Sequence, residues 1–398
     1  MKVLVQAMWV LFGVLFYFYA RQQRLRPWLS GGVVLTFLLS YTVLDLKDSV
    51  VSESTYMVLS TATLLFADSV YRRKLDESHP VRFGALLGLL MVLSVLTRIT
   101  GVALPAAFAV FEVVRFRRIR VFAIAAGAVF VCLFVLYQLT LVVGGGYANH
   151  LIFSFRDLPA NLLFYLKTPA TMWAPLTTAL RYALTTALIL LAVADWVRRV
   201  RNEPRLSEPY VLLYLIPVVL FPQGGTARYS LPVFPFLLLY AAEFISLIVD
   251  NFPRRGRMAA WSTVSVVLVL AAVWNVQSRK HDPDPDGPEA QDFQATVQWL
   301  RQNTRRGELL VFDNPRVLAL YTDRPSAACV YSHDFERVRG FLGRVHAHYF
   351  VTFQDDEDDQ KWSIPVIREH SDAFPVVYRS GRFTVYRVNA LAAAAAAA

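Results

Sequence analysis

The sequence predicts an α-helical polytopic membrane protein of about ten membrane segments, followed by a small α/β domain outside the cytoplasm. Hydrophobic residues make up 56% of the 398 positions and charged residues only 18%, whereas soluble chains carry roughly a quarter charged residues. The charges are also clustered: residues 121–143 contain no Asp, Glu, Lys or Arg. Runs of this length can cross a hydrocarbon core of about 30 Å. A bilayer is therefore the predicted solvent for most of the chain.

The membrane segments are predicted from apolar runs. These runs cover residues 3–20, 29–46, 54–70, 83–97, 99–114, 121–143, 179–197, 210–222, 231–249 and 258–276. Several are shorter than the roughly 20 residues that an upright helix needs, so we expect bent or tilted helices around Arg98 and Pro222.

The arginines indicate the orientation of these segments. Arginine-rich loops alternate with poor ones, and the rich loops lie at residues 21–26, 72–82, 115–120, 198–205 and 254–257. Cytoplasmic loops are the ones enriched in Lys and Arg, so the N-terminus and the segment after residue 276 are expected outside. The net charge of +10 is explained by these loops, and no nucleic-acid partner is expected.

The predicted domains are a transmembrane domain (1–277), a linker rich in Asp and Pro (278–288), an extracytoplasmic α/β domain (289–389) and a non-structural alanine tail (390–398). Within the α/β domain, Phe293, Val297 and Leu300 have helical spacing. Strands are expected at 309–312, 349–353, 376–379 and 383–388, and the last two flank Ser380-Gly381 as a hairpin. The acidic run 355–359 offers ligands for a divalent cation, but a solvated loop is the favoured interpretation, because the spacing and glycine of an EF-hand are absent.

Three carboxylates are candidates for catalysis, namely Asp45, Asp48 and Glu53, where one apolar run ends and the next begins. They would serve as a general base or as metal ligands. Glu53 is the strongest candidate, since it stands at the head of an apolar run and ionisable groups at membrane depth are costly. The alternative is that Asp48 or Ser52 merely caps the following helix.

Two arginines are candidates for binding a phosphate. Arg98 lies between two apolar runs and Arg228 directly precedes one; a guanidinium is suited to bidentate recognition of phosphate. The alternative is interfacial snorkelling. A loop with Tyr147, His150, Arg156, Asp157 and Lys167, and Glu243 inside a later run, are further ionisable positions for which the sequence names no partner.

Four segments together resemble GT-C superfamily glycosyltransferases. SESTYM (52–57) resembles their acidic helix start, LTRITGVALP (96–105) their T-R/K-x-x-G…P segment, and ARYSLPVFPFLLLYAAEF (227–244) their R-Y-x-L-P-x-x-P span. Residues 298–325 resemble the extracytoplasmic domain that follows the spans in many bacterial members.

The resemblance implies transfer of a sugar from a polyprenyl-phosphate donor to an extracytoplasmic acceptor, in the inner membrane of a bacterium. Glu53 matches the acidic helix start, and Arg98, Arg228 and Tyr229 match positions near the donor phosphate. The expected partners are the polyprenyl-phosphate-linked sugar, membrane lipid and membrane proteins, and a divalent cation is the one cofactor considered.

The sequence departs from this family at its start. Family members have a cytoplasmic N-terminus, one more span and a large first external loop with the acidic pair taken as catalytic, and these do not precede the first run here. Either that N-terminal part is missing from the sequence, or the chain is a catalytically inactive accessory subunit of a membrane complex.

Overall fold

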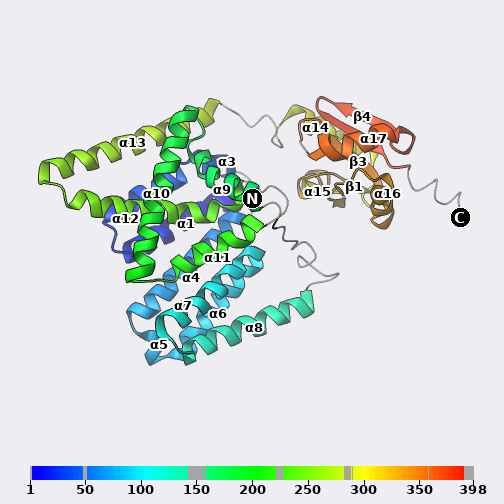
Figure 1. Ribbon diagram of the computed structural model, residues 1–398. Coiled ribbons are helices and arrows are strands. Elements are labelled where there is room, and N and C mark those ends of the chain that lie inside the picture. Colours follow the sequence, from blue (N-terminus) through cyan, green and yellow to red (C-terminus); the bar gives the residue numbers. More distant parts are fainter. Residues whose placement is uncertain are drawn as a thin grey trace. The chain divides into compact units, whose positions relative to one another are not determined.

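The computed structural model describes residues 2–47, 52–141, 155, 158–220, 227–281, 288, 290–356 and 358–389. The chain divides into a helical unit, Met1–His281, and a second unit, Asp282–Ala398 (Figure 1). The last helix of the first unit continues through His281, beyond the boundary at residue 277 that the sequence suggested. The alanine tail, residues 390–398, lies outside the described residues.

The helical unit accounts for every predicted apolar run. Its helices are α1 (Lys2–Gln22), α2 (Pro27–Leu38), α3 (Tyr41–Leu46), α4 (Ser52–Arg72), α5 (Leu75–Ser78), α6 (Pro80–Thr97), α7 (Ala103–Phe116), α8 (Val121–Leu141), α9 (Leu158–Lys167), α10 (Thr178–Asn202), α11 (Ser207–Leu220), α12 (Phe234–Asp250) and α13 (Arg254–His281). Short 3₁₀ turns are η1 (Ile99–Val102), η3 (Thr168–Trp173), η4 (Ala227–Tyr229) and η5 (Leu231–Val233).

The fold class is confirmed as a helical membrane protein, with fewer fully apolar helices than the runs suggested. Among the described residues, 7 helices are long and apolar enough to cross a membrane, and α2 and α11 are shorter apolar helices. The remaining run, residues 54–70, is α4, whose 21 residues include buried polar side chains such as Glu53 and Asp68. These polar groups face the protein, because burial in lipid would leave them without partners.

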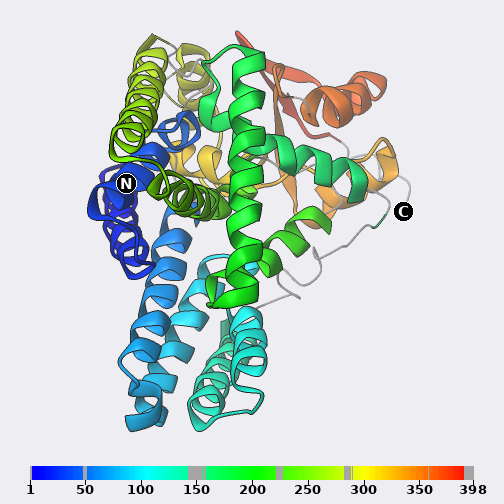
Figure 2. The same ribbon diagram turned by 60° about the vertical axis from the view of Figure 1, so that its left-hand side comes forward.

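Helix α6 packs closely on α8 through two glycines. A Cβ at Gly84 would lie 2.5 Å from the Phe122 carbonyl oxygen, and one at Gly88 would lie 2.4 Å from that of Ala126. Small residues permit this backbone approach between membrane helices. Figure 2 shows α4, α6, α7 and α8, coloured blue to cyan, as one group of neighbouring helices. Few side chains of α8 are buried, and nearly all of its residues are apolar, as expected for a lipid-facing helix.

The second unit contains a five-stranded mixed sheet in the order β2-β1-β3-β5-β4. Its strands are β1 (Leu309–Val311), β2 (Ser326–Ala327), β3 (Ala347–Phe353), β4 (Val376–Ser380) and β5 (Phe383–Arg387). Strand β1 is parallel to β2 and β3, whereas β5 is antiparallel to β3 and β4. The four predicted strands and the hairpin are confirmed; β2 has only two residues and leaves no hydrophobic pattern in the sequence.

Helices cover both faces of this sheet. They are α14 (Gln291–Asn303), α15 (Pro315–Thr322), α16 (Phe335–Arg344) and α17 (Ile364–Glu369), with a π-helical turn η6 (Asp359–Ser363) and a 3₁₀ turn η7 (Ser371–Ala373). Side chains of alternate strand residues enter separate cores: Leu310 packs with α14 and α15, and Val311 with α16 and α17. The period-2 alternation of a strand produces this separation. The unit is thus a three-layer α/β/α domain (Figure 1).

Candidate functional site

Glu53 and the two predicted phosphate-binding arginines meet in the helical unit. The Arg98 Nη1 atom lies 2.6 Å from Glu53 Oε1, and the Arg228 Nε atom lies 3.7 Å from the same oxygen. The side chains of Glu53 and Arg98 are 4% and 8% exposed, whereas that of Arg228 is 43% exposed. One buried carboxylate is therefore shared by an inner and an outer guanidinium.

Local backbone structure positions each of these side chains. Glu53 lies in the first turn of α4, where the helix dipole favours a negative charge. Arg98 is an extended residue (φ −151°, ψ 135°) between α6 and η1. The following chain turns back so tightly that a Cβ at Gly101 would lie 2.7 Å from the Ser94 carbonyl oxygen. Arg228 belongs to η4, just before α12.

Tyr229 lies beside both arginines. Its ring centroid is 5.3 Å from the Arg98 Cζ atom and 5.7 Å from the Arg228 Cζ atom, within the range of cation–π attraction. The Tyr214 hydroxyl donates a hydrogen bond of 2.9 Å to the Tyr229 carbonyl oxygen. The two predicted arginines and the predicted tyrosine are thus part of one cluster.

A set of buried tyrosines adjoins this cluster, and the sequence analysis missed it. The hydroxyls of Tyr56 and Tyr210 are 2.9 Å apart, and the rings of Tyr56 and Tyr214 stack at 5.9 Å. Tyr210 and Tyr214 are four residues apart on α11 and share a helix face. This spacing, inside an otherwise aliphatic run, is the signal that could have identified them.

The charges of the cluster do not cancel. Among the described residues, the ion pairs of Arg98 and Arg228 both go to Glu53, so two positive charges meet one negative charge. An uncompensated cation in a partly buried place favours a bound anion. The outer guanidinium of Arg228 is the accessible side of this site, which defines a candidate anion-binding site.

The remaining predicted site residues are placed as follows. Asp45 lies in α3 with an exposed side chain, and Lys167 ends α9. Asp48, Tyr147, His150, Arg156 and Asp157 lie outside the described residues. The roles assigned to Asp45 and Asp48 therefore stay predictions.

Glu243 has partners that the sequence did not name. Its carboxylate accepts hydrogen bonds from Arg198 Nη2, at 2.6 Å, and from Arg199 Nη2. Arg199 also pairs with Asp195 at 2.8 Å and with Glu208 at 3.4 Å. We call these residues, together with Gln23 and Arg205, the basic-end network, because they gather at the arginine-rich end of α10, with Gln23 directly after α1, Glu208 at the start of α11 and Glu243 within α12.

The basic-end network lies at the opposite end of α4 from Glu53. Gln23 Nε2 donates to Asp68 Oδ2 at 2.7 Å, near the end of α4, whereas Glu53 lies in its first turn. Arg199 was taken from the sequence as part of a basic loop, yet its side chain is only 4% exposed. This network is structural: charge pairs join α10 to α11 and α12, and Gln23 connects Arg199 to Asp68 near the end of α4.

The second unit contains two polar regions at opposite ends of β1. At the carboxyl end, oxygens of Asp313, Asp356 and Asp358 lie within 4.8 Å of one another, a group able to hold a metal ion. Burial raises the pKa of the nearby Asp359 to about 6.

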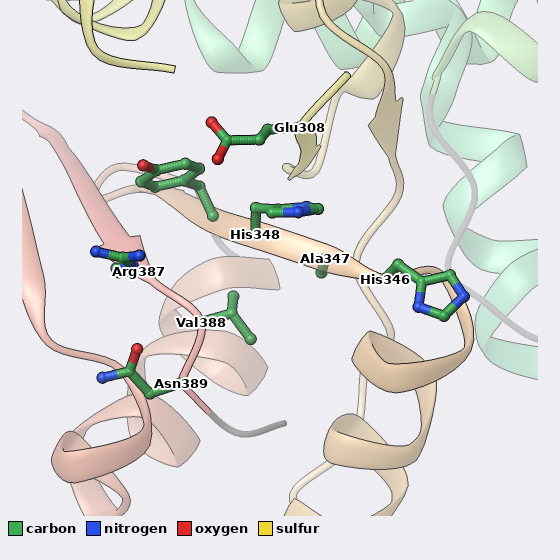
Figure 3. A pocket seen from close by; sticks show the side chains of 8 residues that line it. Glu308, His346, Ala347, His348, Arg387, Val388 and Asn389 are labelled. Atoms are coloured by element: carbon green, nitrogen blue, oxygen red, sulfur yellow. The ribbon is translucent and has the colours of Figure 1, made fainter. Parts of the chain in front are cut away.

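At the amino end of β1, a pocket is lined by residues that include Glu308, His348 and Arg387 (Figure 3). The Leu309 amide donates to His348 Nδ1 at 3.3 Å, so one ring nitrogen is already used by the backbone. The sequence predicted no site here.

Comparison with known proteins relates the fold to solved structures. No family model matches the chain, and no curated protein matches it in sequence. The crystal structure of ArnT from Cupriavidus metallidurans in the apo state is similar over 98% of this chain and 84% of that one, with a TM-score of 0.58 and 12% identity. The structure of ArnT from the same organism bound to undecaprenyl phosphate has a TM-score of 0.51 and 12% identity, over 96% and 83% of the two chains.

The archaeal oligosaccharyltransferase AglB from Archaeoglobus fulgidus, in complex with an inhibitory peptide and a dolichol-phosphate, is also similar. Its TM-score is 0.56 at 11% identity, over 93% of this chain and 61% of that chain. The protein therefore has the fold of GT-C glycosyltransferases over nearly its whole length. The sequence resemblance had predicted this fold from short motifs, and it is confirmed. The fold identifies an integral membrane protein.

Proposed function

We propose that the protein transfers a sugar from a polyprenyl-phosphate donor to an acceptor outside the cytoplasm, with Arg98 and Arg228 binding the donor phosphate. The observation that carries this proposal is the charge imbalance: two guanidiniums meet one buried carboxylate at 2.6 and 3.7 Å. A lipid phosphate supplies the missing negative charge. Guanidinium–phosphate hydrogen bonds are also among the strongest in proteins.

The arginines have distinct parts in this proposal. Arg98 is buried and paired with Glu53, so its guanidinium is held in place and would form the inner wall of the phosphate site. Arg228 is 43% exposed and is the first group that an incoming phosphate meets. When the sugar is displaced at its anomeric carbon, negative charge collects on the departing phosphate, and both cations stabilise it there.

A carboxylate would supply the base of the reaction. Displacement by an acceptor hydroxyl or amine requires a base that removes its proton. Glu53, Asp45 and Asp48 remain the candidates. The ion pair with Arg98 engages Glu53, so its first effect is to orient the guanidiniums, and it acts as a base only if that pair opens.

Two similarities support the donor class. ArnT was solved with undecaprenyl phosphate and AglB with a dolichol-phosphate. Both ligands are polyprenyl phosphates, which share the anionic head that the two arginines suit. We also propose that the protein lies in a bacterial inner membrane, with this site on the extracytoplasmic side, and that it has membrane protein partners.

The test measures binding of undecaprenyl phosphate to the purified full-length protein in detergent. We expect Arg228→Ala to weaken binding about 10-fold or more, because a hydrogen bond to a charged group contributes roughly 1.5–3 kcal/mol. Arg181→Ala is the matched control: Arg181 also lies over a tyrosine ring, that of Tyr182, outside the cluster. Equal binding by the wild type and the Arg228 variant would refute the phosphate site.

A second measurement separates transfer from binding. The protein is reconstituted with a membrane lipid extract, and consumption of polyprenyl-phosphate-linked sugars is followed by mass spectrometry. Consumption that stops in Arg228→Ala and continues in Arg181→Ala supports the enzyme. Binding of the lipid phosphate without consumption of any sugar donor would contradict it, and would favour the catalytically inactive accessory subunit.

A further inference from the structure

Helix α9 has its polar side chains on the buried side and apolar ones outside. Its buried residues are Asn161 and Tyr165, and both carry polar groups. Leu162, Leu163 and Leu166, on the outer side, are each about half exposed. An apolar outer side suits lipid, whereas polar groups of a membrane protein face its interior or a functional cavity. The two buried residues lie four positions apart, so they share one face of the helix.

Asn161 fixes the position of this face. Its side-chain amide donates a hydrogen bond of 2.9 Å to the Val219 carbonyl oxygen on α11, and α9 packs against that helix. Helix α11 also carries Tyr214, whose hydroxyl donates to the carbonyl oxygen of Tyr229 in η4. One helix therefore supports both α9 and the turn that contains Arg228.

Tyr165 lies beside the arginine cluster. The 3₁₀ turn η3 directly follows α9 and packs against η4, so the end of α9 that holds Tyr165 adjoins the turn of Arg228 and Tyr229. Burial raises the pKa of the Tyr165 hydroxyl to about 12, although the nearby charge of Arg98 lowers it. The hydroxyl therefore keeps its proton at neutral pH and is a hydrogen-bond donor.

This donor lacks an acceptor. Tyr165 is 6% exposed, and its hydroxyl is buried without a hydrogen-bond partner among the described residues. The hydroxyls of buried tyrosines usually have a partner, and one without a partner costs free energy. Neighbouring tyrosines follow the rule: those of Tyr56 and Tyr210 bond to each other, and that of Tyr214 bonds to the backbone of Tyr229. An anion in the arginine cluster would supply the acceptor that Tyr165 lacks.

We propose that Tyr165 is a further ligand of the donor phosphate, and that its hydroxyl donates a hydrogen bond to a phosphate oxygen held by Arg98 and Arg228. This inference rests on the proposed function, because it requires a phosphate in the cluster. Since the hydroxyl is covered in the structure, the entering phosphate must displace a neighbouring group. The same hydrogen bond would then stabilise the phosphate as it leaves the sugar.

The test compares Tyr165→Phe, which removes only the hydroxyl, with the matched control Tyr71→Phe. The Tyr71 hydroxyl has a partner in the protein, since it donates to Glu112 Oε1 at 2.6 Å, and it lies at the opposite end of α4 from Glu53. Thermal unfolding and binding of undecaprenyl phosphate are measured for both variants of the full-length protein in detergent.

The two variants should behave in opposite ways. Without lipid, Tyr165→Phe should unfold at no lower temperature than the wild type, because it removes an unpaired polar group. It should weaken binding of undecaprenyl phosphate about 10-fold, the effect of one hydrogen bond to a charged group. Tyr71→Phe should lower the unfolding temperature and leave binding unchanged.

Undecaprenol identifies the group that Tyr165 contacts, because it has the same chain with a hydroxyl in place of the phosphate. Its binding should be equal in the wild type and in Tyr165→Phe. An equal loss of binding for both lipids would place the contact outside the phosphate and would overturn the inference.

The remaining outcomes separate this inference from the proposed function. If Arg228→Ala weakens binding of undecaprenyl phosphate and Tyr165→Phe does not, the phosphate site stands and Tyr165 has no part in it. If the wild type does not bind this lipid, both proposals fail. If lipid-free Tyr165→Phe is as destabilised as Tyr71→Phe, the hydroxyl already has a partner, and the inference is wrong.

Discussion

The two ends of the helical unit both contain buried arginines, but with different numbers of partners. At one end, Arg199 pairs with three carboxylates, those of Asp195, Glu208 and Glu243. At the other end, Arg98 and Arg228 share the single carboxylate of Glu53. In both places a guanidinium is less than 10% exposed. Among the residues that the structure describes, carboxylates neutralise the cations at the first end, whereas at the second end one carboxylate meets two guanidiniums. Buried charge is tolerated where it is paired. The difference therefore separates a place that holds helices together from one that is prepared for an anion.

The largest effect is expected at the neutralised end. Arg199→Leu leaves the carboxylate of Glu208 buried without its guanidinium, and leaves Asp195 with that of Arg198 alone. Breaking a buried pair in this way costs about 3–5 kcal/mol. We expect a strong loss of folded protein and of thermal stability in detergent, measured by tryptophan fluorescence and size exclusion.

Arg201→Leu is the matched control, because Arg201 lies two residues further along α10 and is exposed. If the two variants were equally stable, the basic-end network would contribute nothing to holding the helices.

A smaller effect is expected at the other end. Glu53→Gln preserves the shape of the side chain and removes its charge, so the two arginines lose their counterion. We expect a loss of about 1–3 kcal/mol, the desolvation cost of an unsatisfied buried group. Undecaprenyl phosphate should restore more stability to this variant than to the wild type, since it supplies the missing charge.

Thermal unfolding with and without the lipid phosphate measures this difference. Arg199→Leu provides the contrast, because the same lipid should not rescue a network that is already neutralised by carboxylates. A lipid phosphate that stabilised Glu53→Gln less than the wild type would contradict the assignment of the cluster as an anion site.

The fold could be predicted because length and hydropathy are local properties. Glu53, Arg98 and Arg228 were found for a related reason: each stands at the edge of an apolar run, where a charge is conspicuous. Glu243 was also conspicuous, but its partners Arg198 and Arg199 lie about 45 residues away in the chain. Such pairing depends on how helices approach, which a single sequence does not specify.

The burial of Arg199 and the clustering of Asp313 with other carboxylates could not be predicted from the sequence, for different reasons. The charge of Arg199 was interpreted as part of a solvated loop, because a basic cluster after an apolar run usually is one. Asp313 gave no sign of joining Asp356 and Asp358, which lie more than 40 residues away, until the parallel pairing of β1 and β3 placed their carboxyl ends together.

The smallest effect is expected for an ion pair at a surface. Asp292, in the first turn of α14, accepts from Arg382 Nε at 2.8 Å, and this contact holds the pKa of Asp292 below its usual range. A depressed carboxyl pKa contributes stability above the unfolded pKa of about 3.9, and the contribution is lost as pH falls through the folded value. We expect Asp292→Asn to cost less than about 1 kcal/mol at neutral pH.

Hydrogen exchange of the second unit at pH 7 and near pH 3 measures this contribution. The difference between wild type and Asp292→Asn should shrink in acid. Asp323→Asn is the control, since Asp323 is 75% exposed and its nearest cation is 3.9 Å away. A difference that stayed constant between the two pH values would show that the carboxylate charge is not what stabilises the contact.

Arg98 lies at a joint between two helices and not along either one. Its amide donates to the Ser94 carbonyl oxygen at 3.2 Å, and its own carbonyl oxygen accepts from the Gly101 amide at 2.8 Å. Both flanking segments are thus bonded to this residue, so the direction of its side chain follows the angle between α6 and α7. A change in the tilt of either helix would therefore move the Arg98 guanidinium relative to Glu53.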